Sequence, residues 1–221
     1  MGLRCKDWGD LSKAKVLLIG HDPRLQESDT IAEYCFFADY YFKQVSKIQD
    51  RRKQGLAKSA FNLVMDLTNG KFSVGEIYIT NLCNDELPRT NEGETVYIPQ
   101  EKAEEGIQRI NNILSNSNIE YVFATSLQVN YWLQKLGLYS SDNEFLYETH
   151  PRKSGLINEG PYFKPKKPKS FKKICGNIYD INNHDAKLIP VLHPKLYPLN
   201  ARMREHYYEH YESIKRFFND I

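Results

Sequence analysis

The sequence predicts an α/β fold, a three-layer α/β/α sandwich around a central, mostly parallel four-stranded sheet. Four short apolar runs are rich in Val, Ile, Leu, Tyr and Phe without strict alternation, as is typical of strands covered on both faces. Amphipathic helical patterns lie between these runs, and strands that alternate with helices favour a parallel sheet. The predicted strands are 16–20, 76–80, 120–125 and 188–192.

Helices are expected between and after these strands. Ser28 and Ser126 are suited to begin the first and fourth of them, and Pro99 precedes the third. Gly70 and Gly137 are suited to end the second and the fourth, because glycine adopts the left-handed conformation of a helix C-cap at little cost. The predicted helices are 28–46, 56–69, 100–115, 126–136 and about 200–219.

The length of 221 residues, 41% of them hydrophobic, predicts a single domain over 1–221 with a substantial core. Residues at about 140–186 interrupt the alternation of strands and helices, and we interpret them as an insertion before the last strand. A structureless segment of that length is uncommon in a domain. We therefore expect the insertion to have local structure or a function.

Several classes of protein are excluded by composition. No apolar run approaches the roughly 18 residues of a membrane span, and the N-terminus lacks the apolar region of a signal peptide. The four cysteines form no Cys-x-x-Cys pair, which indicates reduced thiols in a cytoplasmic protein. No metal-ligand spacing stands out, so neither a metal nor another cofactor is expected.

The net charge of +2 hides two basic segments. Residues 151–173 contain eight Lys or Arg and one Glu, and residues 43–58 contain six Lys or Arg and one Asp. The rest of the chain is therefore net acidic. Such a distribution can give a nearly neutral protein a basic face, although two solvated surface segments would explain it equally well.

Polar residues follow three of the predicted strands. Asp22 follows the first strand, Asn81 the second and His193 the fourth. Because ligands bind beyond the carboxyl ends of the strands in an open α/β sheet, we expect these side chains to form a site. Asp22 could orient a water molecule or stabilise a developing cation, and the Asn81 amide has one acceptor and two donors. His193 could donate to an oxygen that gains negative charge.

The motifs around these residues resemble those of the uracil-DNA glycosylase superfamily. They are Gly-His-Asp-Pro at 20–23, Asn-Leu-Cys at 81–83 and His-Pro-Lys-Leu-Tyr at 193–197. The Asn-x-Cys sequence looks like the single-strand-selective branch. Order, strand context and rough spacing agree across nearly the whole chain, except for the insertion.

The resemblance implies hydrolysis of the N-glycosidic bond between deoxyribose and a damaged base, usually uracil, in single- or double-stranded DNA. The base is first flipped out of the stack. Asp22 would stabilise the sugar cation and position the attacking water. His193 would donate to uracil O2, helped by the backbone N–H of His21. Asn81 would accept a hydrogen bond from uracil N3–H and donate one to O4.

The resemblance also implies how DNA is held. Phe36 or Phe37 would stack on the flipped base. Leu196 or Tyr197 would fill the gap that the base leaves in the duplex. Lys195 and the two basic segments would face phosphates. We expect a monomer that needs no cofactor and has no membrane partner.

Four departures from the family pattern bear on specificity, DNA binding and cofactor content. Arg24 stands where the uracil-specific branch has a tyrosine that excludes the thymine methyl group, so the rejection of thymine stays open. Arg24 is also a candidate DNA contact. Leu25 replaces a histidine, and Lys195 occupies a position that is commonly serine. The cysteines do not match the arrangement of the iron–sulfur branches, so no cluster is expected.

Other interpretations stay open at the level of sequence. Asn84 is a rival of Asn81 for the base-reading role, and Asp22 before a proline is also a common turn residue. The protein could be a non-catalytic nucleic-acid-binding member of the same fold, with its site blocked by Arg24 or by the insertion. It could also be a hydrolase of free nucleosides or nucleotides, in which the basic segments have no role.

Overall fold

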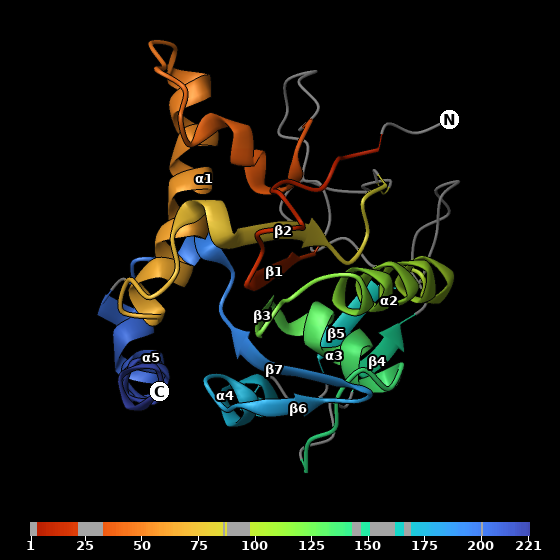
Figure 1. The fold of residues 1–221 in the computed structure, drawn as a ribbon. Helices are drawn as coiled ribbons and strands as arrows, with labels where there is room; N and C mark the ends of the chain where they lie inside the picture. The colour runs from red at the N-terminus through yellow and green to blue at the C-terminus, as the bar shows by residue number, and fades with distance from the viewer. Residues whose placement is uncertain are drawn as a thin grey trace.

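The computed structural model describes residues 4–21, 33–85, 87, 98–142, 147–150, 162–165, 169–199 and 201–221. Its centre is a five-stranded sheet with strand order β2-β1-β3-β7-β6 (Figure 1). The first four strands in this order are parallel, and β6 pairs antiparallel with β7. The strands are β1 (Val16–Gly20), β2 (Ile77–Asn81), β3 (Tyr121–Thr125), β6 (Tyr179–Ile181) and β7 (His184–Val191).

The predicted α/β fold with a mostly parallel sheet is therefore confirmed, but the sheet has five strands and not four. The added strand, β6, forms a hairpin with β7 at the edge of the sheet. It has only three residues, of which Asp180 is exposed and Ile181 buried. So short a segment lacks the continuous apolar run by which the other strands can be predicted.

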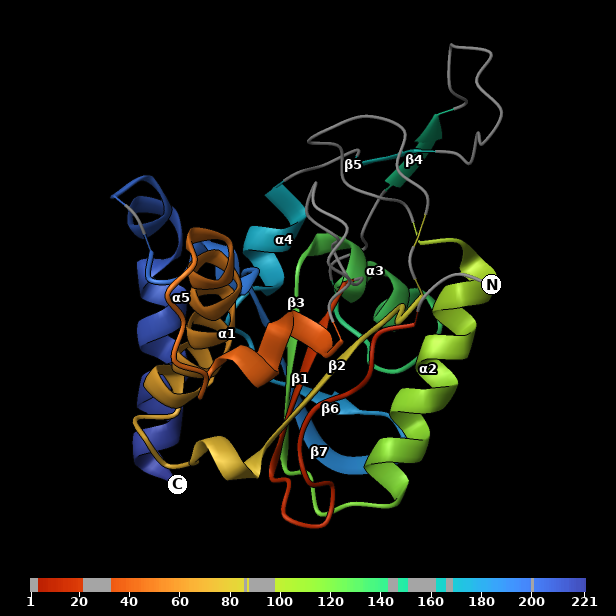
Figure 2. The ribbon, with the colours of Figure 1, turned by 90° about the horizontal axis from the view of Figure 1, so that it is seen from above.

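Helices cover both faces of the sheet, as the three-layer prediction requires (Figure 2). Val16 and Leu18 of β1 contribute to the hydrophobic core beneath α1 and α5, whereas Leu17 and Ile19 contribute to the core beneath α2 and α3. Alternate residues of a strand point to opposite faces, so a strand buried on both faces is apolar throughout. The covering helices are α1 (Ile48–Leu67), α2 (Gln100–Ser115), α3 (Leu127–Lys135) and α5 (Ala201–Asp220).

The predicted helix over 28–46 is wrong. The described part of that segment contains a short 3-10 helix, η1 (Cys35–Tyr40), followed by a loop up to residue 47. Phe36 and Phe37 each have a φ of 55°, in the left-handed region that interrupts a right-handed helix. The rings of Phe36 and Phe37 are buried in the core, and this burial outweighs the local preference for a regular helix.

The other helices agree more closely with the sequence. α1 begins at Ile48, eight residues before the predicted start at 56. The sequence does not reveal these first two turns, because they are mostly polar and have no apolar period. Gly70 and Gly137 have φ values of 74° and 77° just after α1 and α3, as expected of C-caps. Ser126 occupies the N-cap position of α3, as predicted, but its side chain makes no capping hydrogen bond.

The region interpreted as an insertion contains several elements. β4 (Tyr147–His150) and β5 (Tyr162–Pro165) form an antiparallel pair, and α4 (Lys169–Ile174) leads into β6 and β7. In Figure 2, α4 lies at the end of the sheet where β3 passes into α3, which is the carboxyl end of the parallel strands. No helix of the described residues is long and apolar enough to cross a membrane.

Candidate functional site

The polar residues predicted to form a site follow adjacent parallel strands. The chain leaves β1 toward β2 on one side of the sheet, and leaves β3 toward β7 on the other, so the strand order reverses between β1 and β3. Such a switch point opens a crevice at the carboxyl ends of the strands, where ligands bind. His21, Asn81, Ser126 and His193 lie at these ends.

Gly20, Asn81 and Phe36 meet at the end of β1. A Cβ atom added to Gly20 would lie 2.2 Å from Asn81 Oδ1 and 2.5 Å from Cε2 of the Phe36 ring. Real Cβ atoms essentially never approach other heavy atoms so closely, so only glycine allows this arrangement. The amide of Asn81 and the ring of Phe36 therefore lie beside each other over the Gly20 backbone.

The side chain of Asn81 has a polar atom that remains unsatisfied. Asn81 is only 2% exposed, and its Nδ2 atom has no hydrogen-bond partner among the described residues. Burying such a donor without a partner costs about 1–3 kcal/mol. The backbone of the same residue is fixed, because its N–H donates to Asn84 Oδ1 at 3.3 Å and its carbonyl accepts from Arg109 at 2.5 Å. Asn81 thus presents a buried donor that a ligand could satisfy.

Phe36 joins this amide to the last predicted motif. The centroids of the Phe36 and His193 rings are 5.5 Å apart, with the ring planes inclined at 40°. Phe37 turns elsewhere and meets Tyr40 edge-on, with centroids 6.2 Å apart. The left-handed backbone costs roughly 1–2 kcal/mol at each of the two phenylalanines, and strain of this kind concentrates at functional sites. Of the two predicted stacking residues, the structure brings Phe36 to the cluster.

His193 is oriented by the turn that follows it. Its Nδ1 atom accepts a hydrogen bond from the backbone N–H of Lys195 at 3.1 Å. Because a neutral imidazole carries one proton, an accepting Nδ1 places that proton on Nε2. The half-buried ring of His193 therefore presents Nε2 as a donor, which is the tautomer that the predicted role requires.

Leu196 and Tyr197, the two candidates for filling the gap left by a flipped base, differ in their surroundings. Leu196 ends the short helix η3 (Pro194–Leu196), and Tyr197 follows it. Leu196 is 36% exposed, and Lys195 is exposed beside it. Tyr197 is held in place, because its hydroxyl donates to Asp66 and its carbonyl accepts from Ser59 Oγ at 3.1 Å. Burial is also the main cause of the raised pKa of Tyr197. The structure leaves Leu196 available to a ligand and makes Tyr197 an anchor of the loop.

Asn84 also has a clear place in the structure. Its Oδ1 atom accepts from the backbone of Asn81 and from Cys35 Sγ, which is 3.6 Å away, and its Nδ2 atom donates to Asp7 at 2.8 Å. Burial raises the pKa of Cys35, so this thiol keeps its proton and can act as the donor. Since both ends of the Asn84 amide are engaged, Asn81 is the better candidate for reading a base.

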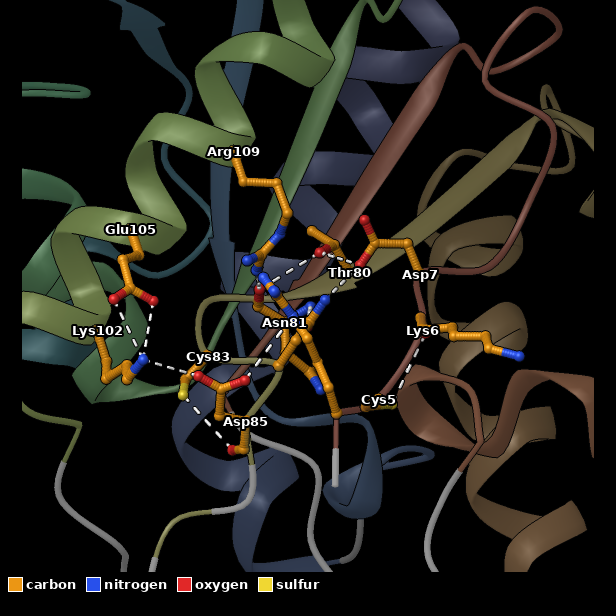
Figure 3. A network of polar contacts seen from close by, with 12 residues as sticks. Cys5, Lys6, Asp7, Thr80, Asn81, Cys83, Asp85, Lys102, Glu105 and Arg109 are labelled. Atoms are coloured by element: carbon orange, nitrogen blue, oxygen red, sulfur yellow. Dashed lines mark hydrogen bonds and ion pairs between the residues drawn. The ribbon is translucent and has the colours of Figure 1, made fainter. Parts of the chain in front are cut away.

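Helix α2 fixes the end of β2 from the other face. Figure 3 shows Arg109 reaching from this helix toward the backbone of Asn81. A Cβ atom added to Gly106 would lie 2.0 Å from the carbonyl oxygen of Leu82, so the helix approaches this loop closely. Lys102 adds an ion pair with Asp85 at 2.9 Å. Only the fold reveals these supports, because they link residues 17 to 28 positions apart in the sequence.

Some predicted site residues cannot be placed in the same way. Asp22 and Arg24 lie outside the described residues. His21, immediately before them, is buried, and its carbonyl accepts from the N–H of Cys83 at 3.0 Å. Ser126 has a φ of 70°, and its buried Oγ has no hydrogen-bond partner among the described residues.

Most cations of the 43–58 segment are exposed. Lys53 is the exception, because it is buried and pairs with Asp50 at 3.3 Å, while Lys43 pairs with Asp39 on the surface. Part of the 151–173 segment lies outside the described residues. The exposed cations in the described parts of the two segments include Lys47, Arg51, Arg52, Lys58, Lys172 and Lys173.

The described residues contain no group of three or more His, Cys, Asp or Glu side chains arranged to hold a metal ion. All four cysteines are buried free thiols. Comparison of the sequence with models of known protein families and with curated proteins finds no match. The function therefore has to be inferred from the chemistry of the site.

Proposed function

We propose that this protein is a DNA glycosylase that hydrolyses the N-glycosidic bond of uracil, or of a related damaged base, in base excision repair. The observation that carries the proposal is the buried amide of Asn81. This amide has an unsatisfied donor and lies beside the Phe36 ring, which in turn contacts His193. An amide, an aromatic face and an imidazole donor are the groups needed to bind a pyrimidine and stabilise it as an anion.

Asn81 would select the base. Uracil offers a donor at N3 and an acceptor at O4, which complement the Oδ1 acceptor and the Nδ2 donor of the amide. Cytosine offers an acceptor at N3 and a donor at N4, so both contacts would be repulsive. Phe36 would stack on the base, which contributes about 1–3 kcal/mol. The missing partner of Asn81 Nδ2 is thus supplied by the substrate.

Bond cleavage develops positive charge on the sugar and negative charge on the base. The electron pair of the glycosidic bond leaves with the base, and the Nε2–H of His193 would donate to uracil O2 as charge collects there. One such preorganised donor contributes roughly 3 kcal/mol to transition-state stabilisation. Asp22 would stabilise the sugar cation and direct the water whose oxygen bonds to it. The water's proton passes to solvent or to the departing base.

DNA binding would use the surface around this site. Flipping a base out of a duplex costs a few kcal/mol. Leu196, exposed on η3, would fill the vacated space, and Lys195 beside it would meet a phosphate. The exposed cations of the two basic segments would add contacts with phosphates along the strand. These contacts predict binding that weakens steeply as the salt concentration rises.

Excision should be much slower in Asp22→Asn, because the amide lacks the charge that stabilises the sugar cation. We expect the wild-type protein to leave abasic sites in uracil-containing oligonucleotides, detected as strand breaks after alkaline treatment. The variant should show at least a 100-fold slower reaction with an unchanged melting temperature.

Folded wild-type protein that produces no abasic sites in single- or double-stranded DNA would refute this function for uracil. Salt-dependent DNA binding without base release would then favour the non-catalytic alternative. Hydrolysis of free nucleosides, with little affinity for DNA, would favour the small-molecule hydrolase.

A further inference from the structure

The N-terminal segment 4–8 runs between the two parts of the candidate site. On one side, Trp8 pairs with Ile79 of β2. On the other side, Lys6 pairs with Tyr34, and its carbonyl accepts from the N–H of Cys35 at 2.9 Å. The segment therefore joins the strand that ends in Asn81 to the residues that lead into Phe36.

Side chains make a second link between the same parts. Asp7 Oδ1 accepts from Thr80 Oγ1 at 2.7 Å and from Asn84 Nδ2 at 2.8 Å. Asn84 Oδ1 then accepts from the N–H of Asn81 and from the thiol of Cys35. Figure 3 shows Asp7, Thr80 and Asn81 gathered at this point. A single amide thus connects the residue that ends β2 to the residue immediately before Phe36.

We infer that the Asp7–Asn84 pair is a positioning unit that sets the spacing between the Asn81 amide and the Phe36 ring. The inference rests on the proposed function. The backbone of Phe36 and Phe37 is left-handed and makes no regular helix, so η1 needs restraint from outside itself. A displacement of about 1 Å in a substrate-positioning group can cost about 100-fold in rate. The pair would act through Asn81 and Phe36 without touching the substrate.

Exchanging donor and acceptor tests this role. In Asn84→Asp, two carboxylates face each other where a hydrogen bond stood, so we expect kcat for uracil excision to fall about 10- to 100-fold. Adding Asp7→Asn restores one donor and one acceptor, with the amide now at position 7. The oxygen of Asp7 that this amide nitrogen replaces also accepts from Thr80, so the Thr80 hydroxyl must instead accept from the amide and donate to the Asn81 carbonyl, 3.3 Å away. Because a hydroxyl can do both and the acceptor for Asn81 and Cys35 is kept, the double variant should recover to within about threefold of the wild type.

Thr68→Val is the matched control for stability, because Thr68, the C-cap residue of α1, is fully buried and its hydroxyl donates to Val64 in that helix. It should lower the melting temperature without lowering kcat at a temperature where it is folded. A second measurement does not depend on activity. Hydrogen exchange of the Asn81 N–H should be about tenfold faster in Asn84→Asp and should return to the wild-type rate in the double variant.

The results distinguish this inference from the proposed function. A wild-type protein that is inactive on uracil would refute the function, and the exchange rates would still test the positioning. The inference is overturned if the double variant is as impaired as Asn84→Asp in exchange or in kcat. It is also overturned if kcat falls equally in Thr68→Val at matched stability.

Discussion

Gly20→Ala should slow base excision by about 100-fold or more, although it adds a single methyl group. The new Cβ would lie 2.2 Å from Asn81 Oδ1 and 2.5 Å from the Phe36 ring, so both side chains must move away. Displacing the groups that hold a substrate by about 1 Å can cost about 100-fold in rate. Overpacking should also lower the free energy of unfolding by roughly 1–3 kcal/mol, measured by urea denaturation.

Gly55→Ala is the matched control for this change. Gly55 lies in α1, and a Cβ added there would meet nothing within 4 Å. Alanine is favoured over glycine in a helix by about 1 kcal/mol, so this variant should be at least as stable as the wild type and equally active. Full activity in Gly20→Ala would show that the Asn81 amide and the Phe36 ring do not act together on a substrate.

His193→Ala should lower kcat by roughly 100- to 1000-fold, because it removes the donor that faces the developing anion. Single-turnover excision of uracil measures this rate without a contribution from product release. His184→Ala is the matched control, since His184 begins the same strand, β7, at its opposite end and contacts Asn111. That variant should retain the wild-type rate.

Equal rates for His193→Ala and the wild type would remove the imidazole from the mechanism. A large loss of DNA affinity with an unchanged kcat would assign His193 to binding and not to stabilisation of the anion. Measuring the rate at saturating DNA distinguishes a loss of DNA affinity from a loss of kcat.

The sequence predicts the sheet and its helices well because burial on both faces leaves a local trace. Residues 16–20 are apolar throughout, since alternate side chains enter the two cores. Amphipathic helices such as α2 show their period in the same way, and its predicted bounds of 100–115 are those of the structure. β6 has no such trace, because three residues at the edge of a sheet are defined only by their pairing with β7.

The candidate site could be predicted only in part. The sequence predicts Asn81 and His193 because they lie at the ends of recognisable strands, and the structure connects them through Phe36. The left-handed backbone at Phe36 is fixed by tertiary packing, so the aromatic run resembled a helix. Asn84 and Arg109 were missed as supports of Asn81, because hydrogen bonds between distant parts of the chain have no sequence period.

The selectivity of Asn81→Asp tests the central claim most directly, because the claim assigns base recognition to this one amide. A carboxylate can only accept, so it loses the contact with uracil O4 and gains one with the cytosine N4 donor. One paired contact of this kind is worth about 1–3 kcal/mol. We predict that the ratio of uracil to cytosine excision, measured in single turnover on matched oligonucleotides, falls by at least about tenfold. An unchanged ratio in a folded, active variant would contradict the proposed role of Asn81.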